Sequence, residues 1–102
     1  MYARIATFEG EPDRADQAVE AARGQVESDW ESPPEGLEAA KEMWMLVDRE
    51  GGKGLGITLY ETEEDLRRGD EALNAMSPAA AEAGGRRTDV SVYEVALRKQ
   101  RD

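Results

Sequence analysis

Five consecutive apolar residues, Met43-Trp44-Met45-Leu46-Val47, limit more than any other feature how this chain can fold. They form the centre of a strand that we predict for residues 39–48. A dense turn signal follows at residues 48–54 (DREGGKG). Successive side chains of a strand point to opposite faces. Three of the five therefore face one way and two the other, so both faces of this strand are apolar.

The first half of the chain also contains a strand and a helix pattern. Residues 2–8 (YARIATF) are rich in aromatic and β-branched side chains and predict a strand. Residues 13–30 predict an amphipathic helix, which Pro33, Pro34 and Gly36 end. The apolar positions with helical spacing in this segment are Ala15, Ala18, Val19, Ala22, Val26 and Trp30.

The second half repeats the alternation. Residues 55–60 predict a strand that forms an antiparallel hairpin with residues 39–48. Leu55, Ile57 and Leu59 lie on one face of this strand, and Thr58 and Tyr60 lie on the other. Residues 62–65 (TEED) resemble a capping box and begin a second helix. Leu66, Leu73 and Met76 supply its apolar stripe. Ser77-Pro78 ends that helix or caps a short extra turn through Ala83, and residues 88–97 (TDVSVYEVAL) predict a last strand.

The order β-α-β-β-α-β predicts an α+β, ferredoxin-like domain over residues 1–97, with a charged tail at residues 98–102. Its four-stranded antiparallel sheet carries both helices on one face. Leu, Ile, Val and Phe number only 16 of 102 residues, and the formal net charge is −10, a pairing typical of disordered chains. The apolar second face resolves this conflict if a second copy covers it. We therefore expect a homodimer that packs sheet on sheet.

The composition excludes several kinds of chemistry. The sequence contains no Cys and no His. Disulfides, thiolate nucleophiles, Ser-His-Asp triads and His-ligated metals or haem are thus ruled out. We expect no cofactor and no metal. The acidic balance argues against nucleic-acid binding, and no apolar run is long enough to span a bilayer. We expect a soluble, cytoplasmic protein.

Three stretches resemble the antibiotic-biosynthesis-monooxygenase-like (ABM) family: MYARIATFEG at the start, WMLVDREGGKGLGITLYETEEDLRR in the middle and VSVYEVA near the end. The resemblance covers nearly the whole chain. It implies a dimeric α/β barrel made of two sheets face to face. It also implies a pocket in each subunit between the sheet and the helices. The glycine-rich turn does not bind phosphate, because Gly54 follows Lys53 where Ser or Thr is needed and no helix follows.

Members of this family differ in activity. Some are cofactor-free monooxygenases that oxidise polycyclic phenols, others degrade haem, and many have no known activity. The haem-degrading branch uses an Asn on the first strand, a Trp on the second helix and a His ten residues later. The Trp would fall near Gly69 and the His near Ala79, and the first strand has no Asn. All three residues are missing, so the resemblance does not extend to that chemistry.

The sequence leaves two functions open. The first is a cofactor-independent oxygenase, or related small-molecule enzyme, acting on an aromatic substrate. The second is a non-catalytic dimer that binds a small ligand or is structural. The catalytic residues stay unknown, but an Arg guanidinium or a Tyr hydroxyl is suited to hold a phenol oxygen. The pocket candidates are Arg4, Trp44, Tyr60, Asn74 and Tyr93.

Each candidate also has an ordinary structural interpretation. Arg4 can pair with an acid such as Glu94 on an adjacent strand. Trp44 can fill the core or the dimer interface. Tyr60 and Tyr93 can lie at sheet edges, and Asn74 can lie on an exposed helix face. The sequence does not choose between the two interpretations.

Overall fold

The computed structural model describes residues 1–76 and 85–101. The elements follow the predicted order, with a short 3-10 turn in front of the first helix. They are β1 (Tyr2–Glu9), η1 (Pro12–Arg14), α1 (Ala15–Glu31), β2 (Glu42–Asp48), β3 (Lys53–Tyr60), α2 (Glu63–Asn74) and β4 (Arg86–Glu94).

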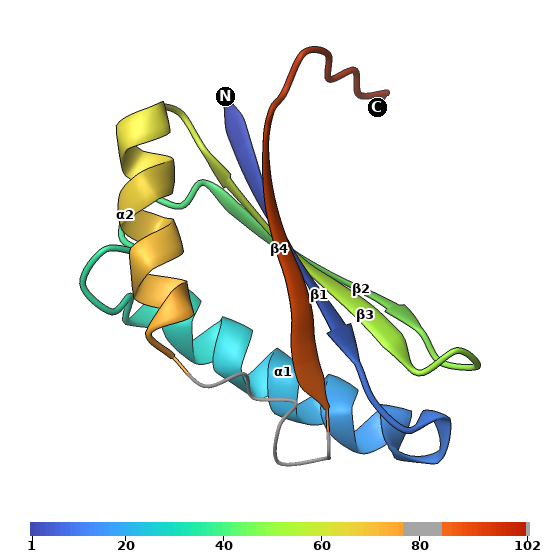
Figure 1. Ribbon diagram of the computed structural model, residues 1–102. Helices are drawn as coiled ribbons and strands as arrows, with labels where there is room; N and C mark the ends of the chain where they lie inside the picture. The colour runs from blue at the N-terminus through green and yellow to red at the C-terminus, as the bar shows by residue number, and fades with distance from the viewer. Residues whose placement is uncertain (77–84, 102) are drawn as a thin grey trace.

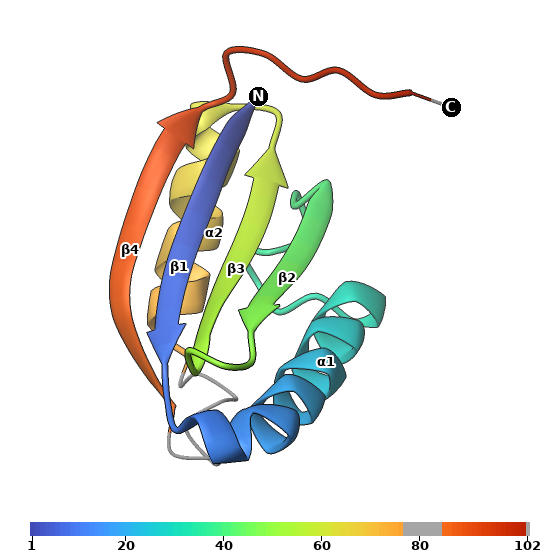
Figure 2. The same ribbon diagram turned by 90° about the vertical axis from the view of Figure 1, so that its right-hand side faces the viewer.

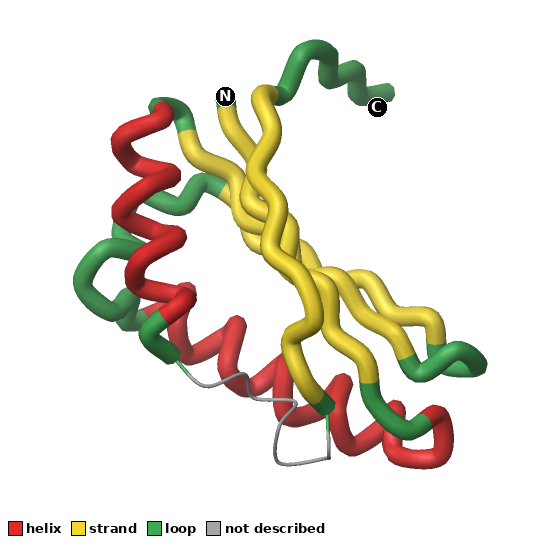
Figure 3. Tube along the Cα trace, viewed as in Figure 1, coloured by secondary structure: helices red, strands yellow, loops and turns green. Residues whose placement is uncertain are grey.

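The four strands form one antiparallel sheet in the order β2-β3-β1-β4. Figure 1 shows that both helices lie on the same side of this sheet, and Figure 3 shows how strongly the sheet twists. Helix α2 packs against β1 and β3, and α1 contacts β2. No helix in the described part of the chain is long and apolar enough to cross a membrane. The predicted ferredoxin-like α+β fold is confirmed.

The strand register assigns every side chain of the sheet to one of two faces. Arg4 pairs with Thr58 on β3 and with Val92 on β4, and its side chain contacts α2. The residues of β1 that lie two or four positions from Arg4 therefore form the helix-facing side, and the register adds Met43, Met45 and Val47 of β2 to it. The opposite side, called the open face below, faces the viewer in Figure 2. It carries Ala3, Ile5, Trp44, Leu46, Leu55, Ile57, Leu59 and Tyr93.

All four strands differ from their predicted bounds by one to three residues, and the largest differences are at the start of β2 and the end of β4. β4 ends at Glu94 instead of Leu97, because Glu94 pairs with Tyr2, the first residue of β1, and beyond it only the Val95 amide bonds Met1. β2 begins at Glu42 instead of residue 39, because the amide of Ala40 turns back to bond the Leu37 carbonyl. The predicted extra turn through Ala83 lies outside the described residues.

The apolar stripe of α1 ends differently from the prediction. Trp30 was expected to continue it, but this side chain is 52% exposed. Asp29 takes the inward position instead and is only 9% exposed. Positions 29 and 30 lie three and four residues beyond the inward Val26, so both fit helical spacing, and the burial assigns the inward position to Asp29.

Local side-chain hydrogen bonds hold the start of α2 and the turn between β2 and β3. The Thr62 hydroxyl accepts a hydrogen bond from the Asp65 amide at 3.0 Å, as the predicted capping box requires. In the turn between β2 and β3, the Asp48 carboxylate accepts from the Gly51 amide at 3.0 Å. Gly52 adopts φ +67°, a conformation that favours glycine. The predicted hairpin turn is confirmed.

The C-terminal tail after β4 runs across the upper ends of the strands on the open side of the sheet (Figures 1 and 2). The Val95 amide donates to the Met1 carbonyl at 2.9 Å. The guanidinium of Arg98 then pairs with the Glu42 carboxylate at 2.7 Å. The tail thus connects the β4 edge of the sheet to the β2 edge.

Two glycines in helices should respond in opposite ways to alanine. Nothing lies within 4 Å of a Cβ added at Gly24, so Gly24→Ala should raise the free energy of unfolding by about 0.5–1 kcal/mol. A Cβ at Gly69 would overlap the Tyr60 hydroxyl, so Gly69→Ala should destabilise. Urea unfolding of both variants checks this. A loss of stability in Gly24→Ala would contradict it.

Candidate functional site

A cavity of about 200 Å³ lies between α1 and the helix-facing side of the sheet. Small side chains on both walls leave this space. Ala18 and Ala22 face it from α1, and Ala6, Gly54 and Gly56 face it from the sheet. Larger apolar residues complete the lining, including Val26, Met43 and Met45. The walls are thus mostly apolar, which suits an apolar ligand.

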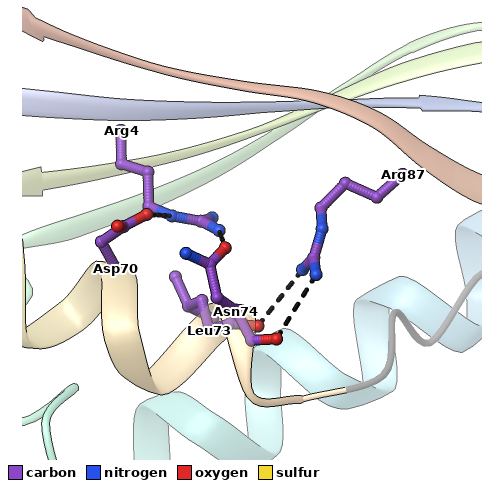
Figure 4. Close-up of polar contacts among 5 residues, drawn as sticks. All are labelled: Arg4, Asp70, Leu73, Asn74 and Arg87. Carbon is purple, nitrogen blue, oxygen red and sulfur yellow. Dashed lines mark hydrogen bonds and ion pairs between the residues drawn. The ribbon is translucent and has the colours of Figure 1, made fainter.

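Arg4 is a buried charged group on the sheet wall of this cavity, and it is only 3% exposed. Glu9, Lys53 and Arg87 line the cavity from other strand positions. Its Nε donates to Asp70 Oδ1 and its Nη2 donates to Asn74 Oδ1, both at 2.8 Å (Figure 4). Asp70 and Asn74 lie one turn apart on α2, so both side chains reach the same guanidinium. The ion pair with Asp70 balances the charge that burial of Arg4 would otherwise leave uncompensated.

A second arginine holds the end of the same helix. Arg87 of β4 donates from Nη1 to the Leu73 carbonyl at 3.2 Å and from Nη2 to the Asn74 carbonyl at 3.5 Å (Figure 4). A positive charge at the C-terminal end of a helix is favourable because the last carbonyls carry partial negative charge. Arg4 and Arg87 together fix the last turn of α2 against two strands.

Tyr60 lies beside this polar cluster, and it is fully buried. Gly69 of α2 makes room for its ring, since any Cβ there would overlap the hydroxyl. Neither the Tyr60 hydroxyl nor that of Thr58 has a hydrogen-bond partner within residues 1–76 and 85–101. Burial raises the pKa of the Tyr60 hydroxyl, so this group is neutral at physiological pH.

The structure separates the five candidate residues into two groups. Arg4, Asn74 and Tyr60 converge on the helix-facing side, next to α2. Trp44 and Tyr93 have their side chains on the open face, where both are about half exposed. The Trp44 indole donates to Glu42 at 3.1 Å.

The structure agrees with the ordinary interpretation of Asn74, which is exposed on α2, and of Tyr93, which lies on the edge strand β4, but it contradicts those of Arg4 and Tyr60. The alternative pairing of Arg4 with Glu94 is wrong, because the strand register places Glu94 opposite Tyr2 and Arg4 turns to α2 instead. Tyr60 is not at an exposed sheet edge, because its ring fills the space against Gly69.

Three polar residues of this region were not identified from the sequence. Asp70 pairs with Arg4, Arg87 binds the end of α2, and Asp29 lines the cavity from α1. The spacing of Asp70 and Asn74 at i and i+4 was a signal for a shared partner. The sequence did not indicate a role for Arg87, because this residue contacts α2 from β4, which is distant in the sequence. In the described part of the chain, no three acidic side chains come together to form a metal site.

Solved structures share this architecture over the full length of the chain. A proposed antibiotic biosynthesis monooxygenase from Deinococcus radiodurans matches with a TM-score of 0.64 at 10% identity, covering 100% of this chain and 99% of its own. An antibiotic biosynthesis monooxygenase matches at 0.57 and 17% identity, covering 96% and 100%. The protein Rv0793 from Mycobacterium tuberculosis matches at 0.55 and 14%, covering 99% and 98%. The chain has the fold of antibiotic biosynthesis monooxygenases.

This likeness is one of fold, because all three identities are low. No family model matches the sequence, and no curated protein matches it. Within the ABM fold, this chain departs from the haem-degrading pattern for a physical reason at one position. Gly69 is closed by Tyr60, so no large side chain fits there. The position near Ala79 lies outside the described residues.

The Arg4–Asp70 pair predicts a stability effect. Asp70→Leu should lower the free energy of unfolding by about 2 kcal/mol, because it leaves the Arg4 charge buried without its carboxylate. Arg4→Met combined with Asp70→Leu should recover part of that loss, since the unpaired charge is gone. Urea unfolding of both single variants and the double variant measures the coupling. Strict additivity would show that the two residues do not depend on each other.

Proposed function

We propose that this protein is a homodimer that binds a small aromatic molecule in the cavity of each subunit. We further propose that it acts on that molecule as a cofactor-independent oxygenase or related enzyme. The observation that carries the proposal is the apolar cavity with the buried Arg4 in its wall. A cavity of roughly 150 Å³ with apolar walls is enough to take benzene. About 200 Å³ therefore suits a molecule of one or two fused rings.

Arg4 supplies the cavity with a fixed positive charge that can bind a ligand oxygen. Two of its nitrogens are used by Asp70 and Asn74, and these bonds hold the guanidinium still. A fixed positive group stabilises a developing phenolate oxygen without having to reorganise. The likeness in fold to antibiotic biosynthesis monooxygenases agrees with such chemistry.

The open face supports the dimer. Leu46 is 44% exposed, and Trp44 and Tyr93 lie on the same face with Leu55 and Ile57. A continuous apolar patch on one face of a sheet favours association. Packing of two identical faces about a two-fold axis would cover it in both copies. The core that one chain is too poor in apolar residues to complete would then be shared.

The alternative is a non-catalytic dimer that only binds its ligand or has a structural role. One observation favours it: the Tyr60 hydroxyl is fully buried and is thereby withdrawn from any substrate. Oxygen uptake that requires both the protein and a fused-ring phenol would support the enzyme. Binding of the phenol without oxygen uptake would support the alternative. The cytoplasmic location stays a prediction, which fractionation of producing cells would check.

Charge placed on the open face should break the dimer. We expect Leu46→Glu to sediment as a monomer at micromolar concentration, because two buried carboxylates would face an apolar interface. Trp30→Glu is the matched control, since Trp30 is 52% exposed but lies on the helix side. Wild-type protein that sediments at about 11 kDa would contradict the proposed dimer.

A bulky side chain in the cavity should displace the ligand. We expect Ala22→Trp to weaken binding of 2-naphthol more than about tenfold, because the indole occupies the ligand's space. Ala21→Trp is the matched control on the same helix, since Ala21 does not line the cavity. Equilibrium dialysis measures the affinities, and circular dichroism confirms folding. Equal affinities for wild type and Ala22→Trp would place the ligand elsewhere.

A further inference from the structure

Asp29 lies where the amphipathic pattern of α1 calls for an apolar residue. Ala15, Val19, Ala22 and Val26 face the interior at helical spacing, and position 29 is the next inward position. The Asp29 side chain is only 9% exposed, and it lines the same cavity as Arg4. The acid is therefore part of the helix wall of the cavity, facing the sheet wall that carries Arg4.

This position is unfavourable for a carboxylate on three counts. The residue is largely removed from water, with 9% of its surface exposed. It lies in the last turn of α1, where the partial negative charge of the free carbonyls opposes a negative side chain. That turn also contains no basic residue. An apolar residue would satisfy the helix and the packing better, so the fold by itself does not call for an acid here.

The hydrogen bonds of Asp29 leave part of the carboxylate unused. Gln25, one turn earlier on α1, donates from Nε2 to Asp29 Oδ1 at 2.9 Å. Among residues 1–76 and 85–101 no Lys or Arg pairs with Asp29, and Oδ2 accepts no hydrogen bond from them. Gln25 fixes the orientation of the carboxylate, and its second oxygen keeps its capacity to accept.

We propose that Asp29 is the hydrogen-bond acceptor for a donor group, O–H or N–H, on the molecule that fills the cavity. The inference rests on the proposed binding function and specifies its ligand. The ligand has an apolar body matched to the alanine and methionine walls, and it carries one donor directed at α1. A carboxylate oxygen that no group in the described part of the chain bonds favours such a ligand over a hydrocarbon, which would leave that oxygen unused.

A pair of probes of nearly equal shape tests this assignment. 2-Naphthol has the donor, and 2-methylnaphthalene replaces it with a methyl group. We expect wild-type protein to bind 2-naphthol about tenfold more tightly in equilibrium dialysis, as one hydrogen bond to a charged group predicts. Asp29→Leu should bind both probes equally and should melt at a higher temperature than wild type. Glu27→Leu, an exposed acid on the same turn, should keep the wild-type preference.

The possible results separate this inference from the binding function it rests on. If neither probe binds to wild type, the proposed function fails and the inference fails with it. If both bind wild type equally, or if Asp29→Leu retains the preference, only the inference fails. A lower melting temperature for Asp29→Leu would show that Asp29 is structural, which also overturns it. Asp29→Asn keeps an acceptor oxygen without the charge, so it should retain a reduced preference for 2-naphthol.

Discussion

The contact between Arg4 and α2 is the interaction on which the helix-facing side of this protein depends. Arg4 is buried in the central strand β1, and it bonds two side chains that lie one turn apart on α2. Helix α2 has few large apolar residues of its own, chiefly Leu66 and Leu73. Polar contacts from the sheet therefore determine where this helix lies. Its position in turn closes Tyr60 beneath Gly69.

The same contact explains why a cavity with apolar walls contains fixed charge. An unpaired arginine would be costly there, and the ion pair with Asp70 offsets that cost. On the other wall, Ala18 and Ala22 of α1 line the cavity together with Gly54 and Gly56 of β3. The space is thus a direct result of side-chain size on two elements. The polar side chains that line it, Arg4 and Asp29, are fixed by hydrogen bonds to residues of the helices.

Much of this architecture followed from local patterns in the sequence. The five apolar residues from Met43 to Val47 predicted a strand with two apolar faces, and the strand register confirms the alternation. The capping box at Thr62 and the glycine-rich hairpin were also recognisable, because both depend on residues adjacent in sequence. The strand ends were less predictable. Where β4 stops depends on where β1 begins, which is a long-range condition.

The candidate site could be predicted only in part for the same reason. Arg4 and Asn74 were identified separately by residue type, but no local pattern joins residues 70 positions apart. Asp29 was missed because positions 29 and 30 both lie at helical spacing from Val26, three and four residues on. Trp30 was the more apolar of the two and was favoured for that reason. Burial reverses the choice, with Asp29 inside and Trp30 outside.

The hydrogen bond from the Val95 amide to the Met1 carbonyl has a practical consequence. It brings the beginning of the first strand and the end of the last to one corner of the sheet, beside the open face (Figure 2). The tail after Val95 then runs on to the β2 edge, so the two ends meet at this corner only if the chain is cut after Val95. A short linker could then join Val95 to Met1, and the chain could be reopened at the exposed Pro33. Such a circular permutant would carry its free ends far from the face where a second copy is expected to bind.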